Sequence, residues 1–294
     1  MAYAIEHDET TGAAIARIVR EQIARAREQL TDRKAPVEKR VHDARKRFKE
    51  IRAVLRLARE PFGAQFDVEN AWYRDAGHTL AGARDADAVL EALEKLAKIT
   101  PLPGATLRRT RRLLKKRRPS AHELSAHIDG ALALLQTALD RVDSWPPLAD
   151  SFDTIADGLA RTYRNGRRAM RVAVDTKLPD DFHEWRKRVK EHWYHTQLLR
   201  HVWPDVMKPY ATVMETMSKT LGDHHDLTVL RRVVASDARH LGRRAFVVAM
   251  LDAIAARQLE LEREAETIGA RVYAEPPRQW LARMSNYWST WRGN

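Results

Sequence analysis

The stretch Val41–Glu50, VHDARKRFKE, is the most informative part of this 294-residue chain, because it recurs as Phe182–Glu191, FHEWRKRVKE. Six of its ten positions are identical in the two copies, which lie 141 residues apart. The identical pairs are His42/His183, Arg45/Arg186, Lys46/Lys187, Arg47/Arg188, Lys49/Lys190 and Glu50/Glu191. Apolar residues recur at helical spacing in and after the first copy, so both copies are predicted to be helical.

The same offset relates residues far outside the two copies. The matching pairs are Arg20/Arg161, Arg27/Arg168, Thr79/Thr220, Leu80/Leu221 and Asp85/Asp226. A single offset that holds over such a length predicts two copies of one structural unit. We expect a first half over residues 10–145 and a second over residues 146–290, with the seam at Trp145-Pro146-Pro147. Together they would form one domain.

The composition favours an all-α fold. Gly and Pro number only twelve each, whereas Ala, Leu, Arg and Glu, all good helix formers, are abundant. No stretch alternates apolar and polar residues with period two, so we predict no strand. We expect two modules of four to six helices each around a basic central cavity, with prolines such as Pro209 separating the helices.

The charge balance points to a polyanionic partner. The chain carries 52 Lys and Arg against 40 Asp and Glu, a formal net charge of +12. It has no cysteine, which excludes a disulfide framework, a thiolate zinc site and a cysteine nucleophile. The N-terminal MAYAIEHDETTG is acidic and lacks an apolar run, and no window resembles a membrane span. We therefore expect a cytoplasmic protein that does not bind membranes.

The repeated motif places a basic stripe beside an apolar one. On a helical projection the first copy groups His42, Arg45, Lys46, Lys49 and Arg56, and the second groups His183, Arg186, Lys187, Lys190 and Tyr194. A basic stripe that borders the core is suited to the edge of a groove. A solvated surface is the alternative, but no acidic residue occupies any of these positions in either copy.

Two arginine rows add to this charge. Arg161, Arg164, Arg168 and Arg171 share one helical face, and Arg17, Arg20 and Arg27 nearly repeat that spacing. If these helices line the same seam as the repeated motif, about a dozen cations converge and require an anion. Phosphate suits them, because Arg binds it through a bidentate fork and Lys as a point charge. Arg20, Arg27, Arg161, Arg164 and Arg168 therefore join the candidate contacts.

The paired motifs resemble the CHAD family of conserved-histidine α-helical domains. That family shows a His-x-x-Arg-x-x-x-Lys helix in each half, here His42, Arg45, Lys49 and His183, Arg186, Lys190, followed by a Leu-Gly-x-x-Arg/His-Asp-x-x-x-Leu element, here Leu80 to Leu90 and Leu221 to Leu230. The likeness extends from about residue 10 to 290. It implies a pseudo-two-fold helical fold with a basic central cavity or pore that binds inorganic polyphosphate.

This chain departs from the family pattern at two places. Glu191-His192-Trp193-Tyr194 stands where the family often has Arg-x-Arg-Tyr, which shortens the basic lining of the second half. First-half Ala81-Gly82 also slips by one position from Leu221-Gly222.

Two other functions compete with this interpretation. His224-His225-Asp226 contains the His-Asp pair of metal-dependent phosphohydrolases, but Arg84, which cannot bind a metal ion, stands in place of His225 in the first half. Asp85 and Asp226 would instead accept hydrogen bonds from Arg or begin a helix. Nonspecific nucleic-acid binding fits the charge, although stacking aromatics are scarce on the basic faces. We expect binding without catalysis, and neither a metal ion nor another cofactor.

Other features leave choices open. His192 is predicted to be a core histidine, and the C-terminal Trp and Tyr residues to be helix-packing residues. The segment Arg108–Arg118, RRTRRLLKKRR, is either a phosphate-binding rim or a nonspecific exposed patch. The expected partner is inorganic polyphosphate or another polyanion, with association with polyphosphate granules as one location. The sequence leaves the oligomeric state open.

Overall fold

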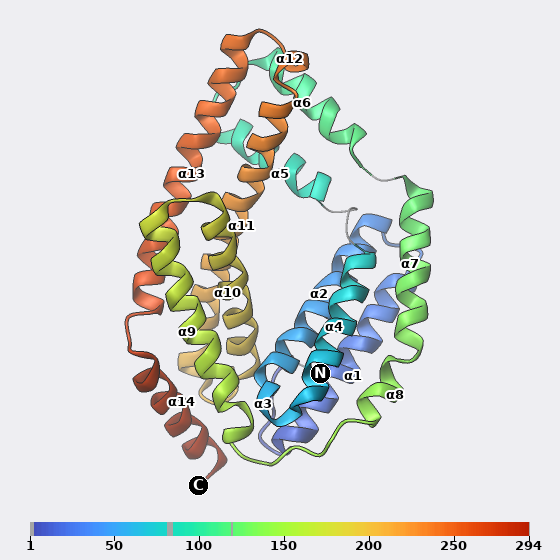
Figure 1. Ribbon diagram of the computed structural model, residues 1–294, viewed down its shortest axis with the longest axis vertical. Helices are drawn as coiled ribbons and strands as arrows, with labels where there is room; N and C mark the ends of the chain where they lie inside the picture. Colours follow the sequence, from blue (N-terminus) through green and yellow to red (C-terminus); the bar gives the residue numbers. More distant parts are fainter. Residues whose placement is uncertain (1–2, 81–84, 119, 294) are drawn as a thin grey trace.

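The computed structural model describes residues 3–80, 85–118 and 120–293, and every regular element in them is a helix. Figure 1 shows the helices arranged in two arms. The first half contributes α1 (Thr11–Thr31), α2 (Val37–Leu57), α3 (Arg59–Phe62), α4 (Ala64–Thr79), α5 (Asp85–Ile99), α6 (Gly104–Lys116), α7 (Ala121–Gln136) and α8 (Ala138–Asp143). The second half contributes α9 (Asp153–Thr176), α10 (Pro179–Leu198), α11 (Pro204–Ser236), α12 (Ala238–Leu241), α13 (Arg244–Val272) and α14 (Pro277–Arg292). The predicted all-α fold is confirmed.

The repeated motif forms the middle of α2 and of α10. Val41, Ala44 and Phe48 of α2 are almost fully buried, as are Phe182 and Trp185 of α10, so the apolar sector of each copy faces the core. The start of α10 is encoded locally. Pro179 occupies its first turn, where the missing N–H costs no hydrogen bond, and the acidic residues that follow complement the helix dipole.

Direct contacts join α2 to α10 across the two halves. His195 Nε2 of α10 lies 2.8 Å from the carbonyl oxygen of Ala53 in α2, and both residues are buried. The N-terminal segment spans the same junction. Tyr3 donates its hydroxyl hydrogen to the Glu50 carbonyl, and the Ile5 amide donates to the Leu198 carbonyl. The two halves are therefore connected through α2 and α10 at the base of the arms (Figure 1).

Two apolar cores explain how the arms close. The larger core contains buried residues of α1, α2, α4, α7, α9, α10, α14 and the first part of α11. The smaller core combines Val89, Leu93 and Leu96 of α5 with residues of α6, α13 and the last part of α11. In this way α5 and α6, from the first half, pack on helices of the second half (Figure 1). This crossing makes the chain one folded unit rather than two separate domains.

Proline positions were only partly informative. Pro209 lies inside α11 and does not end it, so the prediction of a break there is wrong. It falls in the second turn, where proline removes one backbone hydrogen bond, and the packing of the rest of this 33-residue helix outweighs that loss. The first half also contains more helices than the four to six we expected. At the 141-residue offset, the long α11 of the second half corresponds to the shorter α4 and α5 of the first half. In the same way, the long α13 corresponds to the shorter α6 and α7.

The helix starts of α2 and α4 agree with the 141-residue offset to within one residue. α2 and α10 begin at Val37 and Pro179, and α4 and α11 begin at Ala64 and Pro204. The structural repeat itself, and the central cavity or pore that the resemblance implies, stay predictions.

Within the described residues, no helix combines the length and the apolar character needed to cross a bilayer.

Candidate anion-binding site

A basic cleft lies where the repeated motifs of α2 and α10 face each other. It consists of two adjoining hollows of about 400 and 230 Å³ that share Lys49 and Arg186. The larger hollow is bounded by α2 and α10, and the smaller one also by α5 and α11. We call the two hollows together the α2–α10 cleft.

Positive charge dominates the lining of the cleft. Among the residues that the structure describes, the cations of the lining are Arg45, Lys49, Arg52, Arg56, Arg186, Lys187, Arg188 and Lys190, and the carboxylates are Glu191 and Asp226. Tyr194 and His225 also contribute to the walls. Lys187 and Arg188 also pair with Glu184 outside the cleft, but eight cations against these three described acids still leave an excess that an anionic ligand would neutralise.

The repeated Arg and Glu of each motif form an ion pair, and the pair of the second motif, Arg188 and Glu191, lines the cleft. Arg47 Nη1 lies 2.8 Å from a Glu50 carboxylate oxygen, and Arg188 Nη1 lies 3.6 Å from one of Glu191. Glu191 also lies 3.8 Å from Arg56 Nε of the opposite helix. Burial raises the pKa of Glu50, and its Arg and Lys neighbours oppose that shift. Glu191 therefore neutralises part of the charge of the cleft, whereas Glu50 lies outside its lining.

Arg52 is a cation of the cleft that the sequence prediction missed. Its Nε donates to the Asn70 side-chain oxygen at 3.1 Å. Burial lowers its pKa to about 10, with Arg56 and Arg74 adding repulsion, so the guanidinium stays protonated at neutral pH. Helical spacing could have identified it, because Arg52 lies three residues after Lys49 and four before Arg56. Arg188, also missed, carried a signal as a repeated position.

A stacked pair of imidazoles lies beside the smaller hollow. The rings of His183 in α10 and His225 in α11 are 4.1 Å apart at an angle of 30°. Burial lowers the pKa of His183, and Arg186 and Lys187 lower it further. Burial lowers the pKa of His225 to about 4, with His183 and Arg186 adding to the shift. Both rings are therefore neutral at pH 7 in the unliganded protein.

The lysine of the second motif lies against aromatic rings. Lys190 Nζ is 4.3 Å from the ring centre of Trp193 and 5.3 Å from that of Tyr194. Such cation–π contacts hold the ammonium group in position. Tyr194 itself is almost fully buried, so it contributes little exposed surface to the cleft.

The structure brings together about half of the predicted contacts. Seven line the cleft, namely Arg45, Lys49, Arg56, Arg186, Lys187, Lys190 and Tyr194, and His183 lies beside it. His42 and Lys46 belong to α2 but line neither hollow; they lie near Asp43 and Glu50, respectively. Only part of the basic stripe of α2 therefore faces the cleft.

The two arginine rows lie elsewhere. On α1, Arg20 pairs with Asp143 at 2.6 Å on the surface, and Arg27 is exposed. On α9, Arg161 pairs with Glu60 of α3, and Arg164 is exposed. Burial and the nearby Arg59 and Arg164 lower the pKa of Arg161. None of these four residues lines the cleft, so the rows and the repeated motifs do not form one seam.

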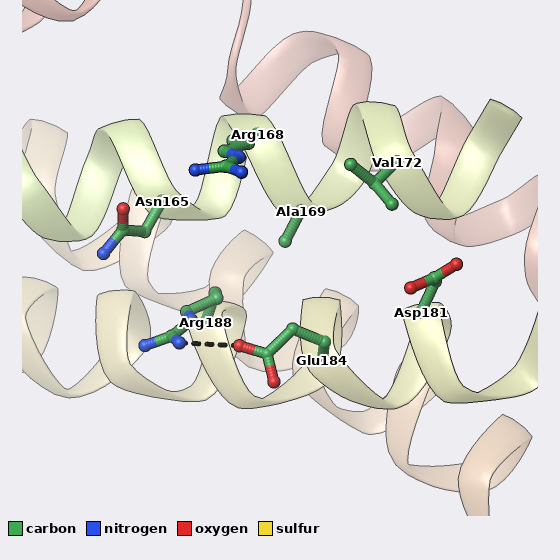
Figure 2. Close-up of a pocket in the computed structure, with 7 residues that line it drawn as sticks. All are labelled: Asn165, Arg168, Ala169, Val172, Asp181, Glu184 and Arg188. Atoms are coloured by element: carbon green, nitrogen blue, oxygen red, sulfur yellow. Dashed lines mark ion pairs between the residues drawn. The ribbon is translucent and has the colours of Figure 1, made fainter. Parts of the chain in front are cut away.

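The fifth candidate contact from the rows, Arg168, lies in a separate hollow of about 300 Å³ between α9 and α10. Figure 2 shows Asn165 and Arg168 on one helix opposite Asp181, Glu184 and Arg188 on the other. An ion pair of 2.6 Å joins Arg188 to Glu184. Its two cations are matched by two carboxylates, so this hollow has no excess charge for an anion.

The histidines of the competing phosphohydrolase interpretation point to different partners. His224 is buried and lies 3.1 Å from the Glu262 carboxylate of α13, whereas His225 stacks on His183. Among the residues that the structure describes, no three His, Asp or Glu side chains are grouped to hold a metal ion. The side chain of Asp85 and all of Arg84, also discussed for that motif, lie outside the described residues.

The aromatic predictions are confirmed where the structure tests them. His192 is 1% exposed, and burial lowers its pKa to about 3. Its ring nitrogens lie 3.4 and 3.5 Å from the hydroxyls of Tyr273 and Tyr210. Trp280 of α14 stacks on Tyr163 of α9 with ring centres 4.5 Å apart. These side chains dock helices and do not reach the cleft.

Comparison with known proteins agrees with this architecture. The family model described as CHAD domain matches residues 14–235. A crystal structure of the CHAD domain from the plant Ricinus communis is similar in fold, with a TM-score of 0.64 over 94% of this chain and 96% of that one, at 16% sequence identity. No curated protein matches. The CHAD model covers most of the chain, including both basic motifs and the cleft between them, and on that basis the protein belongs to the CHAD domain family.

Proposed function

We propose that the protein binds inorganic polyphosphate in the α2–α10 cleft and does not transform it. The excess of cations in the cleft is the observation that carries the proposal. Polyphosphate offers one anionic group after another and no bases, so charge and shape are its only recognition features. A cleft lined mainly by Arg and Lys, with few acids among its described residues, suits such a polymer.

The geometry also favours an extended anion over a single phosphate. The cations come from two facing helices, and the two hollows adjoin each other at Lys49 and Arg186. Successive phosphates could therefore contact α2 and α10 together. Affinity would come from charge neutralisation and release of counterions, which makes binding strongly dependent on salt.

Titration with long-chain polyphosphate at two salt concentrations tests the proposal. If about eight phosphates are neutralised, we expect a slope of log affinity against log salt of roughly −5 to −6, by analogy with single-stranded nucleic acid. The double variant Lys49→Glu/Lys190→Glu should lose affinity on the order of hundredfold, because it reverses two charges in the cleft. Circular dichroism should show that the helices persist.

A second double variant controls for net charge. Lys208→Glu/Arg278→Glu reverses two exposed charges on α11 and α14, away from the cleft lining. It should retain most of the affinity. Equal losses in the two variants would mean that the protein senses only total charge and would reject the cleft as the site. Single-stranded DNA that competes at equal concentration of phosphate would favour nucleic-acid binding instead. Steady release of phosphate from polyphosphate would contradict the non-catalytic role.

A further inference from the structure

A second basic surface lies on α6, outside the cleft. Its residues are Arg108, Arg111, Arg112, Lys115 and Lys116, which line one shallow hollow of about 400 Å³. We call them the α6 stripe. Their spacing places them on one face of the helix, while Thr106, Thr110 and Leu114 are buried on another. The packing of α6 on the smaller core therefore fixes the stripe toward the outside.

The α6 stripe has few counterions. Arg111 pairs with Glu94 of α5 at 2.5 Å. The other four residues of the stripe make no ion pair with any residue that the structure describes. Like charges at this spacing on a helix repel one another, so the stripe lowers the stability of α6 unless an anion is bound.

The stripe begins next to the cleft. Ala88 and Val89 of α5 line the smaller hollow, and the neighbouring Asp87 pairs with Arg118 just after the end of α6. Seven residues further along α5, Glu94 pairs with Arg111. α6 thus runs back along α5, and the rise of a helix places these two ion pairs about 10 Å apart along its axis. From its C-terminal end, the α6 stripe therefore runs along α5 away from the residues that line the smaller hollow.

We infer that the α6 stripe extends the polyphosphate path beyond the cleft, so that long chains contact both surfaces and short chains only the cleft. This inference rests on the proposed function. It predicts a dependence of affinity on chain length, because a chain held in the cleft presents its next phosphates to α6 at high effective concentration.

The test compares tripolyphosphate with long-chain polyphosphate on the variant Arg108→Gln/Arg112→Gln/Lys116→Gln. Gln is a good helix former, so α6 should be preserved. Affinity for tripolyphosphate should equal that of the unchanged protein. Affinity for the long chain should fall on the order of tenfold to hundredfold, and the salt slope should become shallower by about 2, because three charges are removed.

The matched control is Lys208→Gln/Arg271→Gln/Arg278→Gln, which removes three exposed charges from α11, α13 and α14. If the α6 variant and this control bind the long chain equally well, the inference is overturned. It is also overturned if the α6 variant loses tripolyphosphate, because α6 would then be the primary site. The proposed function fails separately, if Lys49→Glu/Lys190→Glu retains tripolyphosphate binding.

Discussion

The α2–α10 cleft and the α1 and α9 arginine rows are both strongly basic, yet their charges have different surroundings. In the cleft, cations from two facing helices surround two carboxylates. In the rows, Arg20 and Arg161 pair with surface acids from neighbouring helices, and Arg168 lies in a hollow where charges balance. An excess of cations at a concave site, rather than the number of cations on a helix, therefore marks a place for an anion.

The largest expected effect is on stability, at the contact between α9, which carries one arginine row, and α2, which lines the cleft. Gly158 of α9 packs so closely on α2 that a Cβ at this position would lie 2.0 Å from the Leu57 carbonyl oxygen. Gly158→Ala should lower the free energy of unfolding by about 1–3 kcal/mol, because the helices must separate. Urea unfolding followed by circular dichroism measures this change.

Gly130 of α7 supplies the matched control for that substitution. A Cβ there would meet no atom within 4 Å, and the residue is exposed. Gly130→Ala should raise the free energy of unfolding by up to about 1 kcal/mol through helix propensity alone. If both substitutions stabilise the protein equally, the close contact between α9 and α2 is not a feature of the folded state.

A change of pH should affect the cleft and leave the rows unaffected. In the free protein, burial lowers the pKa of His225 to about 4 and lowers that of His183 as well. A bound polyanion raises both values, so binding takes up protons. Affinity should therefore rise several-fold as the pH falls from 8 to 6. Titrations in two buffers that differ in ionisation enthalpy measure the proton uptake.

Among the described residues, the charged and titratable groups around this pair lie on three helices. They are Asp180, Glu184, Arg186 and Lys187 on α10, His224, Asp226 and Arg232 on α11, and Arg45 and Lys49 on α2. His183→Gln/His225→Gln should remove most of the pH dependence, and an unchanged dependence would assign it to other groups. Circular dichroism at each pH is essential, because histidines with lowered pKa make unfolding easier as the pH falls below 6.5.

The smallest effect is expected in the arginine rows. Arg20→Gln/Arg27→Gln/Arg164→Gln removes three charges that lie outside the cleft. Exposed charges separated from the ligand by more than about 10 Å are largely screened at 0.1 M salt. Polyphosphate affinity should change by no more than about twofold. A loss as large as that of Lys49→Glu/Lys190→Glu would show that the rows belong to the binding surface.

The sequence was a sound guide to the helices and to part of the site. Apolar spacing located α2 and α10, and the recurrence of their basic residues was enough to identify Lys49, Arg186 and Lys190. Arg20, Arg27 and Lys46, which the sequence also proposed, do not line the cleft, since a helical projection shows which residues share a face but not what that face meets. Arg52 does line the cleft, and its spacing from Lys49 and Arg56 is the signal that could have identified it.

What the sequence determined by itself is the helical fold class, the excess of positive charge and the basic stripe beside each core stripe. These properties depend on local spacing and composition, which need no knowledge of distant residues. Only the tertiary structure decided which cations meet across the cleft, which acids neutralise the others, and that α5 carries α6 over to the second half. These features depend on contacts between residues that are far apart in the chain, and the local spacing of residues does not specify such contacts.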